Sequence, residues 1–136
     1  MKKRFLQFKL EAKAVMIALL WGVVGMMNGY TQNLIVGDLI YSINDDGVSV
    51  TIMSHKDYSS ATGSLVIPES IVYEGNNYVV TAIGEYAFYY CTRLTGNLVI
   101  PTSITTIGES AFYNCGFTEV HYNATNCADI GFSNYG

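Results

Sequence analysis

Residues 108–112, with the sequence Gly-Glu-Ser-Ala-Phe, contain the serine that comes nearest to a catalytic nucleophile. The run partly matches the Gly-x-Ser-x-Gly turn, in which a sharp turn between a strand and a helix exposes the serine hydroxyl. The final glycine is missing, and the equivalent place in a similar upstream segment holds Tyr86. Because this position differs between two copies of one segment, we predict that Ser110 is a surface residue and not a nucleophile.

The three cysteines and two histidines are the next candidates, for redox or metal chemistry. Three is an odd number for a disulfide framework, and no two of these cysteines have metal-ligand spacing. Cys91 and Cys115 end two similar segments, so we expect buried free thiols that pack as small apolar residues; a disulfide between them is the alternative. Cys127 lies beyond those segments and is expected to be exposed. His55 and His121 stand alone.

Carboxylates complete the search for chemistry. Asp45 and Asp46 are adjacent, but the sequence around them lacks the further oxygen ligands of a calcium loop. No pair of carboxylates, metal cluster or nucleophile–base pair remains. The sequence therefore predicts no catalytic residue, no metal and no cofactor, and the protein is not expected to be an enzyme.

Tyrosines are the residues whose number and spacing do indicate a function. Tyr86, Tyr89, Tyr90 and Tyr113 crowd two similar segments, and exposed tyrosine is enriched in binding surfaces because it supplies contact area at low entropic cost. We expect these four and His121, at an outward position of a short strand, to belong to a ligand-binding surface. The alternative is that the rings pack within the fold and that His121 is only a solvated polar residue.

The amino terminus reads as a targeting segment. Its basic residues Lys2, Lys3, Arg4, Lys9 and Lys13 precede an uncharged apolar run at 14–27. That run suits the core of a signal peptide and is shorter than the roughly 20 apolar residues that span a bilayer. We predict a signal peptide at 1–29, cleaved near Gly29 to Thr31, with an uncleaved membrane anchor as the alternative. No stable membrane span is expected after its removal.

Removal of this segment changes the charge balance. The remainder keeps two basic residues, Lys56 and Arg93, against ten carboxylates, so 2 − 10 gives a net charge of −8. A chain this acidic is repelled by phosphate backbones and by anionic membranes. Nucleic-acid binding is therefore excluded as a function.

Residues 30–62 predict a β-hairpin followed by a loop. Apolar residues alternate in 38–43 and again in 48–52, and the Asn-Asp-Asp-Gly run at 44–47 suits a tight turn with positive φ. Residues 54–63 are polar and rich in serine, which indicates a loop.

Residues 63–127 contain about two repeats and a partial third. The run 65–71 recurs at 98–104, and 83–91 recurs at 107–115, while an insertion at 72–80 reads as a second small hairpin. Residues 117–122 begin a third copy, and 128–136 form a polar tail in which no strand or helix is predicted. Each copy is too small to bury its own apolar face, so the copies must stack.

The stacked copies predict a mainly β fold with short helical or 3₁₀ turns. Leu65, Leu98 and Val120 fall on short strands that pair between coils, and Phe88 and Phe112 fall on the turns with their rings packed inward. Residues at the same position of each repeat are expected to form ladders along a solenoid.

The patterns Ile-Pro-x-Ser-Ile at 100–104 and Ile-Gly-x-x-Ala-Phe-x-x-Cys at 83–91 and 107–115 resemble the BspA-type leucine-rich repeat of bacterial surface proteins. The resemblance covers roughly residues 38–126. It implies a right-handed solenoid with an N-terminal β-hairpin module, secreted or displayed on the bacterial cell surface and used for adhesion and protein binding.

The predicted function is therefore a secreted or cell-surface binding or adhesion module that recognises a protein or a glycan through its repeat surface. The alternative is a structural or truncated repeat fragment without binding of its own. About three repeats and a polar cap are normally needed for an independent array. A fragment with fewer repeats would self-associate by strand pairing through its open C-terminal coil.

Overall fold

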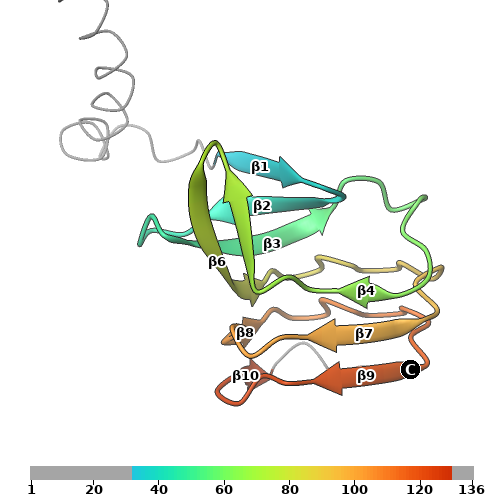
Figure 1. Ribbon diagram of the computed structural model, residues 1–136. Helices are drawn as coiled ribbons and strands as arrows, with labels where there is room; N and C mark the ends of the chain where they lie inside the picture. The colour runs from blue at the N-terminus through green and yellow to red at the C-terminus, as the bar shows by residue number, and fades with distance from the viewer. Residues whose placement is uncertain (1–31, 130–136) are drawn as a thin grey trace, which may run out of the picture. The chain divides into compact units, whose positions relative to one another are not determined.

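The computed structural model describes residues 32–129. The predicted signal peptide at 1–29 and most of the predicted tail at 128–136 lie outside these residues. Ten strands within the described part form a seven-stranded sheet and a three-stranded sheet (Figure 1). The fold is mainly β, as predicted, and the described residues contain no helix that could cross a membrane.

Three antiparallel strands begin the larger sheet: β1 (Asn33–Val36), β2 (Leu39–Ile43) and β3 (Ser49–His55). The sequence did not predict β1, and β3 runs two residues into the segment that was expected to be a loop. Asp46 closes the turn between β2 and β3, because its carboxylate accepts the backbone N–H groups of Val48 and Ser49, each at 2.9 Å.

A second hairpin connects these strands to the repeats. β5 (Ser70–Tyr73) and β6 (Asn76–Ile83) pair antiparallel. The turn between them is formed by Glu74 and Gly75, whose φ angles are 49° and 81°. Positive φ at both central residues suits a tight hairpin turn. This pairing confirms the hairpin predicted in the insertion. β6 also pairs in parallel with β3, so the N-terminal strands and the repeats share one sheet.

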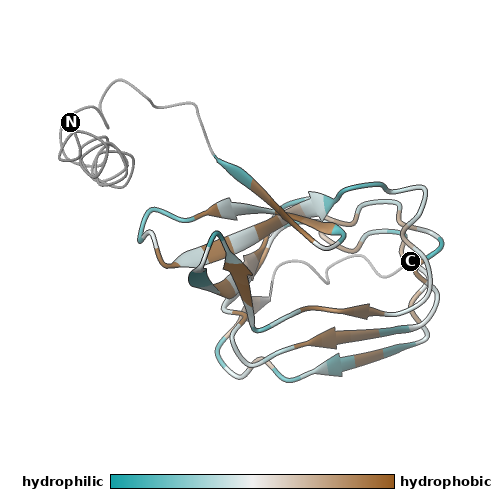
Figure 2. Cartoon of the chain, turned by 45° about the horizontal axis from the view of Figure 1, so that its top comes forward, coloured by the Kyte–Doolittle hydropathy of each residue, from teal (hydrophilic) through white to brown (hydrophobic). Residues whose placement is uncertain are grey.

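The repeats stack as predicted. β4 (Leu65–Val66), β7 (Asn97–Ile100) and β9 (Glu119–Tyr122) form the three-stranded parallel sheet, with Leu65 beside Leu98 and Leu98 beside Val120. Figure 2 shows hydrophobic residues, in brown, in each of these three stacked strands, with β9 otherwise mostly teal. The register confirms the ladder of equivalent positions.

The larger sheet is continued by two further parallel strands. β8 (Thr106–Ile107) pairs with β6, and β10 (Ala128–Asp129) pairs with β8. β10 falls in the tail for which no strand was predicted. Its two-residue length gives too little alternation for a sequence pattern to reveal it.

The predicted short helices are wrong. In residues 84–91 only every second backbone N–H donates a hydrogen bond to an oxygen of its own coil, as Tyr89 does to the oxygen of Tyr86 at 3.1 Å. The alternate N–H groups reach the next coil, as from Phe88 to the oxygen of Ala111 at 2.8 Å. A helix needs every N–H for bonds within its own segment. Because half of the N–H groups donate to the neighbouring coil, the segment forms consecutive turns and not a helix.

The core lies between the two sheets and the stacked turns. The rings of Phe88 and Phe112 stack with centroids 5.4 Å apart and planes 4° from parallel. Ala87 and Ala111 are fully buried beside them, and Cys91 is buried in the same layer. The phenylalanine ladder predicted from the repeats is therefore present.

Candidate functional site

Stacking of the turns at 84–91 and 108–115 brings four tyrosines together. The rings of Tyr89 and Tyr113, from successive coils, stack with centroids 5.2 Å apart. Tyr90 lies 4.6 Å from Tyr89 and 5.6 Å from Tyr113, and Tyr86 meets Tyr89 edge to face at 5.4 Å. We call Tyr86, Tyr89, Tyr90 and Tyr113 the tyrosine cluster. Three of them are well exposed, at 48%, 39% and 54% for Tyr86, Tyr89 and Tyr90.

Two members of the tyrosine cluster have an unusual backbone conformation. Tyr86 has φ = 55° and Tyr90 has φ = 59°, and the equivalent Ser110 and Asn114 of the next coil have 51° and 57°. The turn itself imposes positive φ, for which asparagine is suited and a bulky side chain is not. Each tyrosine is thus held at a cost of roughly 1–2 kcal/mol relative to a residue that tolerates this region.

The hydroxyl of Tyr89, the ring that contacts the other three, is neutral at physiological pH. Burial raises the pKa of the Tyr89 phenol, and the neighbouring phenols of Tyr90, Tyr113 and Tyr86 raise this pKa further because a second phenolate would be repelled. A neutral phenol both donates and accepts a hydrogen bond. Tyr89 therefore adds a hydrogen-bond donor and an acceptor to the exposed ring area of the cluster.

His121 does not join the tyrosine cluster. It lies on β9 in the three-stranded sheet, beside Val99, at the outward position that the repeats predicted. Its Nε2 lies 3.4 Å from a carboxylate oxygen of Glu119, and both side chains are exposed. The tyrosines belong to turns that follow β6 and β8 of the other sheet. The binding surface proposed from the sequence thus divides into two separate places.

The cysteines are free thiols in the structure. Cys91 is buried, as expected, and Cys115 is half-buried with its Sγ 3.1 Å from the backbone oxygen of Phe88. Burial raises the pKa of Cys91 to about 11 and that of Cys115 to about 12, so neither forms the reactive thiolate at neutral pH. The expectation for Cys127 was wrong, because it is half-buried and packs against the core.

The remaining residues that were considered for catalysis or metal binding have structural roles or lack the partners that such chemistry needs. Ser110 is half-buried in a turn, and its hydroxyl has no histidine or carboxylate partner among the described residues. Asp46 is used in the turn before β3, where the hydroxyl of Ser49 and two backbone N–H groups lower its pKa. Within residues 32–129 no three His, Cys, Asp or Glu side chains are grouped so that they could hold a metal ion.

Short parallel strands stacked in register, with leucine, isoleucine, phenylalanine and cysteine repeated in the core, define a leucine-rich-repeat protein. The family described as "BspA type Leucine rich repeat region (6 copies)" matches residues 58–135. The chain belongs to this family, as its repeat motifs predicted.

Solved structures are similar to this chain over most of the described residues. A leucine-rich repeat protein from Bacteroides capillosus is 34% identical with a TM-score of 0.57, and the match covers 67% of this chain and 65% of that one. A leucine-rich repeat protein from Bacteroides ovatus is 26% identical with a TM-score of 0.57, and the match covers 64% of this chain and 22% of that one.

A leucine rich cell surface protein from Faecalibacterium prausnitzii is similar in fold, with 24% identity, a TM-score of 0.59, and 69% of this chain and 24% of that one covered. The match thus spans less than two thirds of each of these proteins. Among curated proteins no relative matches this chain.

Proposed function

We propose that this chain is a secreted or cell-surface module that binds another macromolecule through the tyrosine cluster and carries out no catalysis. The observation that carries the proposal is the set of four contacting rings, two of them on residues held at positive φ. Strained residues are retained where surrounding structure and function favour them. Glycine or asparagine at positions 86 and 90 would remove the backbone strain. We infer that tyrosine occurs there because its aromatic ring has a function.

A protein ligand fits the cluster better than a glycan. The planes of Tyr86 and Tyr89 meet at 82° and those of Tyr89 and Tyr90 at 61°. These angles present ring edges and hydroxyls in several directions, in place of one flat platform for a sugar ring. Exposed tyrosines with adaptable hydroxyls are typical of protein-binding surfaces.

Export is the second part of the proposal. The basic residues before an apolar run at 14–27 support a signal peptide, and family membership supports a bacterial surface or secreted location. Amino-terminal sequencing of the exported chain tests this. We expect a new terminus near Gly29 to Thr31, whereas an intact terminus in the membrane fraction would favour an anchor.

The solenoid is inferred to wind with a right hand and to begin with the N-terminal β-hairpin as its first module. β4, β7 and β9 are parallel and joined by crossovers, which are right-handed in about 98% of cases because of strand twist. The parallel pairing of β3 with β6 supports the role of residues 30–62 as the module on which the repeats stack.

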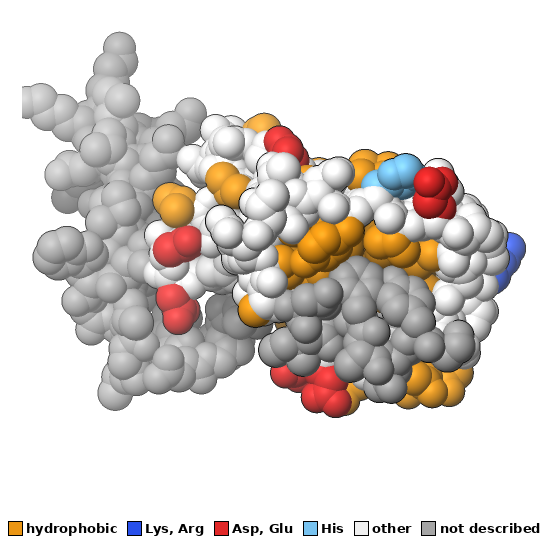
Figure 3. All heavy atoms as spheres, turned by 90° about the horizontal axis from the view of Figure 1, so that it is seen from below, with side chains coloured by type: hydrophobic (Ala, Val, Ile, Leu, Met, Phe, Trp, Pro, Cys, Tyr) orange, Lys and Arg blue, Asp and Glu red, His pale blue; other side chains and the backbone are white. Residues whose placement is uncertain are grey.

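Self-association through the last coil is a second candidate function, favoured by one specific observation. Leu98 and Ile100 on β7 are fully buried, but Val120 and Tyr122 at the same positions of β9 are 37% and 39% exposed. Figure 3 shows hydrophobic side chains gathered at this end of the molecule. A second copy is the occupant that we propose, and sedimentation velocity over a range of concentrations tests it. Val120→Asp is expected to keep the chain monomeric if the wild type associates.

Binding through the tyrosine cluster is tested with arrays of purified extracellular proteins and of glycans. Tyr89→Ala removes the ring that touches the other three. Tyr58→Ala is the matched control, because Tyr58 has a similar exposure, 46% against 39% for Tyr89, but lies outside the cluster. We expect Tyr89→Ala to weaken binding to a protein at least tenfold, as for central aromatic contacts, and Tyr58→Ala to leave it unchanged.

Two results would count against the proposal, and a third would change the class of ligand. Absence of any bound protein or glycan would refute a binding function for this surface, and an equal loss with Tyr58→Ala would refute the location. Binding confined to glycans and lost with Tyr89→Ala would retain the site and correct the ligand class.

A further inference from the structure

A polar cavity lies where the N-terminal strands meet the first repeat coil. It has a volume of about 370 Å³. Its polar lining comes from the turn before β2, the end of β3, the loop after β3 and the segment before β4, namely Asp38, His55, Ser60, Thr62 and Ser64. This volume falls in the range of about 300–1,000 Å³ typical of small-molecule sites. No sequence motif joins these residues, because Asp38 comes from one segment and the other four are spread irregularly over a second.

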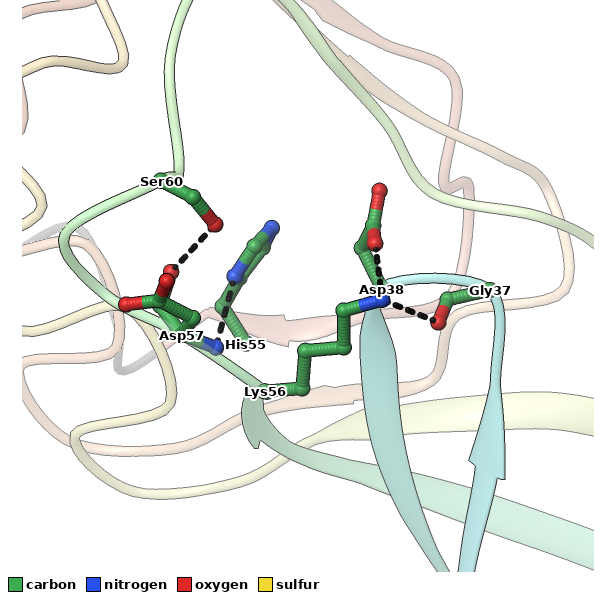
Figure 4. A network of polar contacts seen from close by, with 6 residues as sticks. All are labelled: Gly37, Asp38, His55, Lys56, Asp57 and Ser60. Atoms are coloured by element: carbon green, nitrogen blue, oxygen red, sulfur yellow. Dashed lines mark hydrogen bonds and ion pairs between the residues drawn. The ribbon is translucent and has the colours of Figure 1, made fainter.

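His55 is the buried polar residue of this cavity. Its side chain lines the cavity although the residue is only 8% exposed. Nδ1 accepts the backbone N–H of Asp57 at 3.2 Å, and Figure 4 shows the second ring nitrogen pointing away from Asp57. A neutral imidazole that accepts at Nδ1 carries its proton on Nε2. The hydrogen bond thus assigns Nε2–H as a donor, and this donor has no partner among the described residues.

The three hydroxyls offer a mixture of donors and acceptors. Ser60 donates to the backbone oxygen of Asp57 at 3.1 Å, so its own oxygen remains free to accept. Ser64 accepts the N–H of Asn97 at 3.0 Å, so its hydrogen remains free to donate. Thr62 makes no hydrogen bond within the described residues and can do both. A ligand with hydroxyl groups, which also donate and accept, matches this set.

A fixed carboxylate stands at the edge of the cavity. Lys56 Nζ lies 2.7 Å from Asp38 Oδ1 and 3.4 Å from the backbone oxygen of Gly37 (Figure 4). The hydrogen bond from Lys56 and its positive charge lower the pKa of Asp38, so the carboxylate is ionised at neutral pH. Its second oxygen is an acceptor for hydroxyl groups.

Apolar side chains complete the cavity. Leu65 and Leu94 line it and belong to the hydrophobic core. A sugar ring has C–H groups on its faces and hydroxyls around its edge, so it needs both kinds of surface. An amine ligand would be attracted by Asp38, but Lys56 already neutralises that carboxylate at 2.7 Å.

We propose that this cavity binds a neutral sugar, either free or as the terminal unit of a glycan. His55 Nε2–H and the Ser64 hydroxyl donate to ligand hydroxyls, Asp38 and Ser60 accept from them, and Thr62 does either. The site is independent of the tyrosine cluster and does not rest on the function proposed for it. The lining disfavours uronic acids and sugar phosphates, because it includes no lysine or arginine side chain that could pair with an anion. The chain after residue 29 also carries a net charge of −8 (2 basic against 10 acidic residues).

The histidine ring signals give a direct test, because the chain has two histidines and only His55 lines the cavity. The full chain, labelled with ¹⁵N, is titrated separately with glucose, galactose, mannose and N-acetylglucosamine, and with glucuronic acid as the charged probe. We expect saturable shifts of the His55 ring signals with at least one neutral sugar. His121 serves as the internal reference and stays unshifted. Glucuronic acid should bind at least tenfold more weakly.

Two variants locate the contact without disturbing the fold. Thr62→Val removes a hydroxyl that has no partner in the described protein, and Asp38→Asn keeps the shape of the side chain while removing its charge. We expect roughly tenfold weaker binding in the first and tenfold to hundredfold in the second, as for loss of a neutral and of a charged hydrogen bond. Thr125→Val, at an exposed threonine outside the cavity, is the matched control and should bind as the wild type does.

Clear results would overturn the proposal. It fails if none of the neutral sugars shifts His55, if His121 shifts equally, or if glucuronic acid binds as well as the neutral sugars. It also fails if Thr62→Val and Thr125→Val bind alike. Tyr89→Ala should leave sugar binding unchanged, so failure at the cavity and failure at the tyrosine cluster can be distinguished.

Discussion

Substitution of Gly108 by alanine tests whether close stacking of the coils holds this fold together. A Cβ atom at this position would lie 2.3 Å from the N of Glu85 and 2.6 Å from the carbonyl carbon of Gly84. Normal contacts between such atoms are about 3.5 Å, so the two coils would have to separate by roughly 1 Å. Both neighbouring atoms are backbone, and no rotamer change can relieve the clash.

The expected loss of stability follows from the bonds around Gly108. Its N–H donates to Ile83 at 2.7 Å, and the N–H of Tyr86 donates to Glu109 at 3.0 Å. Separation by roughly 1 Å weakens both bonds, at about 1 kcal/mol each, and strained packing adds about 2 kcal/mol. The sum is about 4 kcal/mol, a large part of the roughly 5–15 kcal/mol of a typical domain.

Urea unfolding followed by far-UV circular dichroism measures this loss. Gly116→Ala is the matched control, because its Cβ would lie 3.1 Å from the Cγ2 of Thr95, a side-chain atom, and 3.2 Å from the oxygen of Thr92. We expect Gly116→Ala to lower the free energy of unfolding by less than about 1 kcal/mol, with the same denaturant slope. A Gly108→Ala protein within about 1 kcal/mol of the wild type would refute the stacking argument.

Three further predictions concern the turns and thiols. Asn114 has φ = 57°, a conformation that asparagine tolerates and a bulky residue does not. Asn114→Tyr should therefore lower the free energy of unfolding, measured in urea, by roughly 1 to roughly 2 kcal/mol. The pKa of Asp46 is lowered by the Ser49 hydroxyl and by backbone N–H groups, so the wild type should be more stable than Asp46→Asn at neutral pH. That difference should shrink as pH falls below the ordinary pKa of 3.8 and through the lowered pKa of the folded state, in urea titrations over pH. Cys91 and Cys115, with pKa values of about 11 and 12, should resist iodoacetamide at pH 8 in the folded protein and react after unfolding, as mass spectrometry would record.

The repeat motifs predicted the stacked strands but not the form of the turns. Residues 87, 88 and 91 are buried while 86, 89 and 90 are exposed, which is the periodicity of a helix. Periodicity reports which side chains face the core and does not report where the backbone N–H groups donate. Those of Tyr86, Phe88 and Tyr90 donate to the next coil, and this contact between residues distant in sequence decides the conformation.

The candidate sites differ in how far the sequence reveals them. The tyrosine cluster follows from repeat positions, because equivalent residues of stacked coils must be neighbours. The positive φ of Tyr90 had one signal, its alignment with Asn114, since asparagine tolerates that region. No signal in the sequence revealed the cavity around His55. Its lining depends on how the loop after β3 lies against the first coil, and only the Asp57–His55 hydrogen bond reveals the free donor at Nε2.

Both candidate sites are products of stacking and not of a single coil. The tyrosine cluster needs the turn at 84–91 to lie on the turn at 108–115, since Tyr89 contacts Tyr113 across that boundary. The cavity needs the N-terminal strands to lie on the first coil, since His55 comes from β3 and Leu94 from the repeat. Two stacking contacts therefore suffice to build both surfaces, whatever number of coils follows. A ligand at either site would contact groups on both sides of one such boundary, so binding should stabilise that stacking and raise the free energy of unfolding.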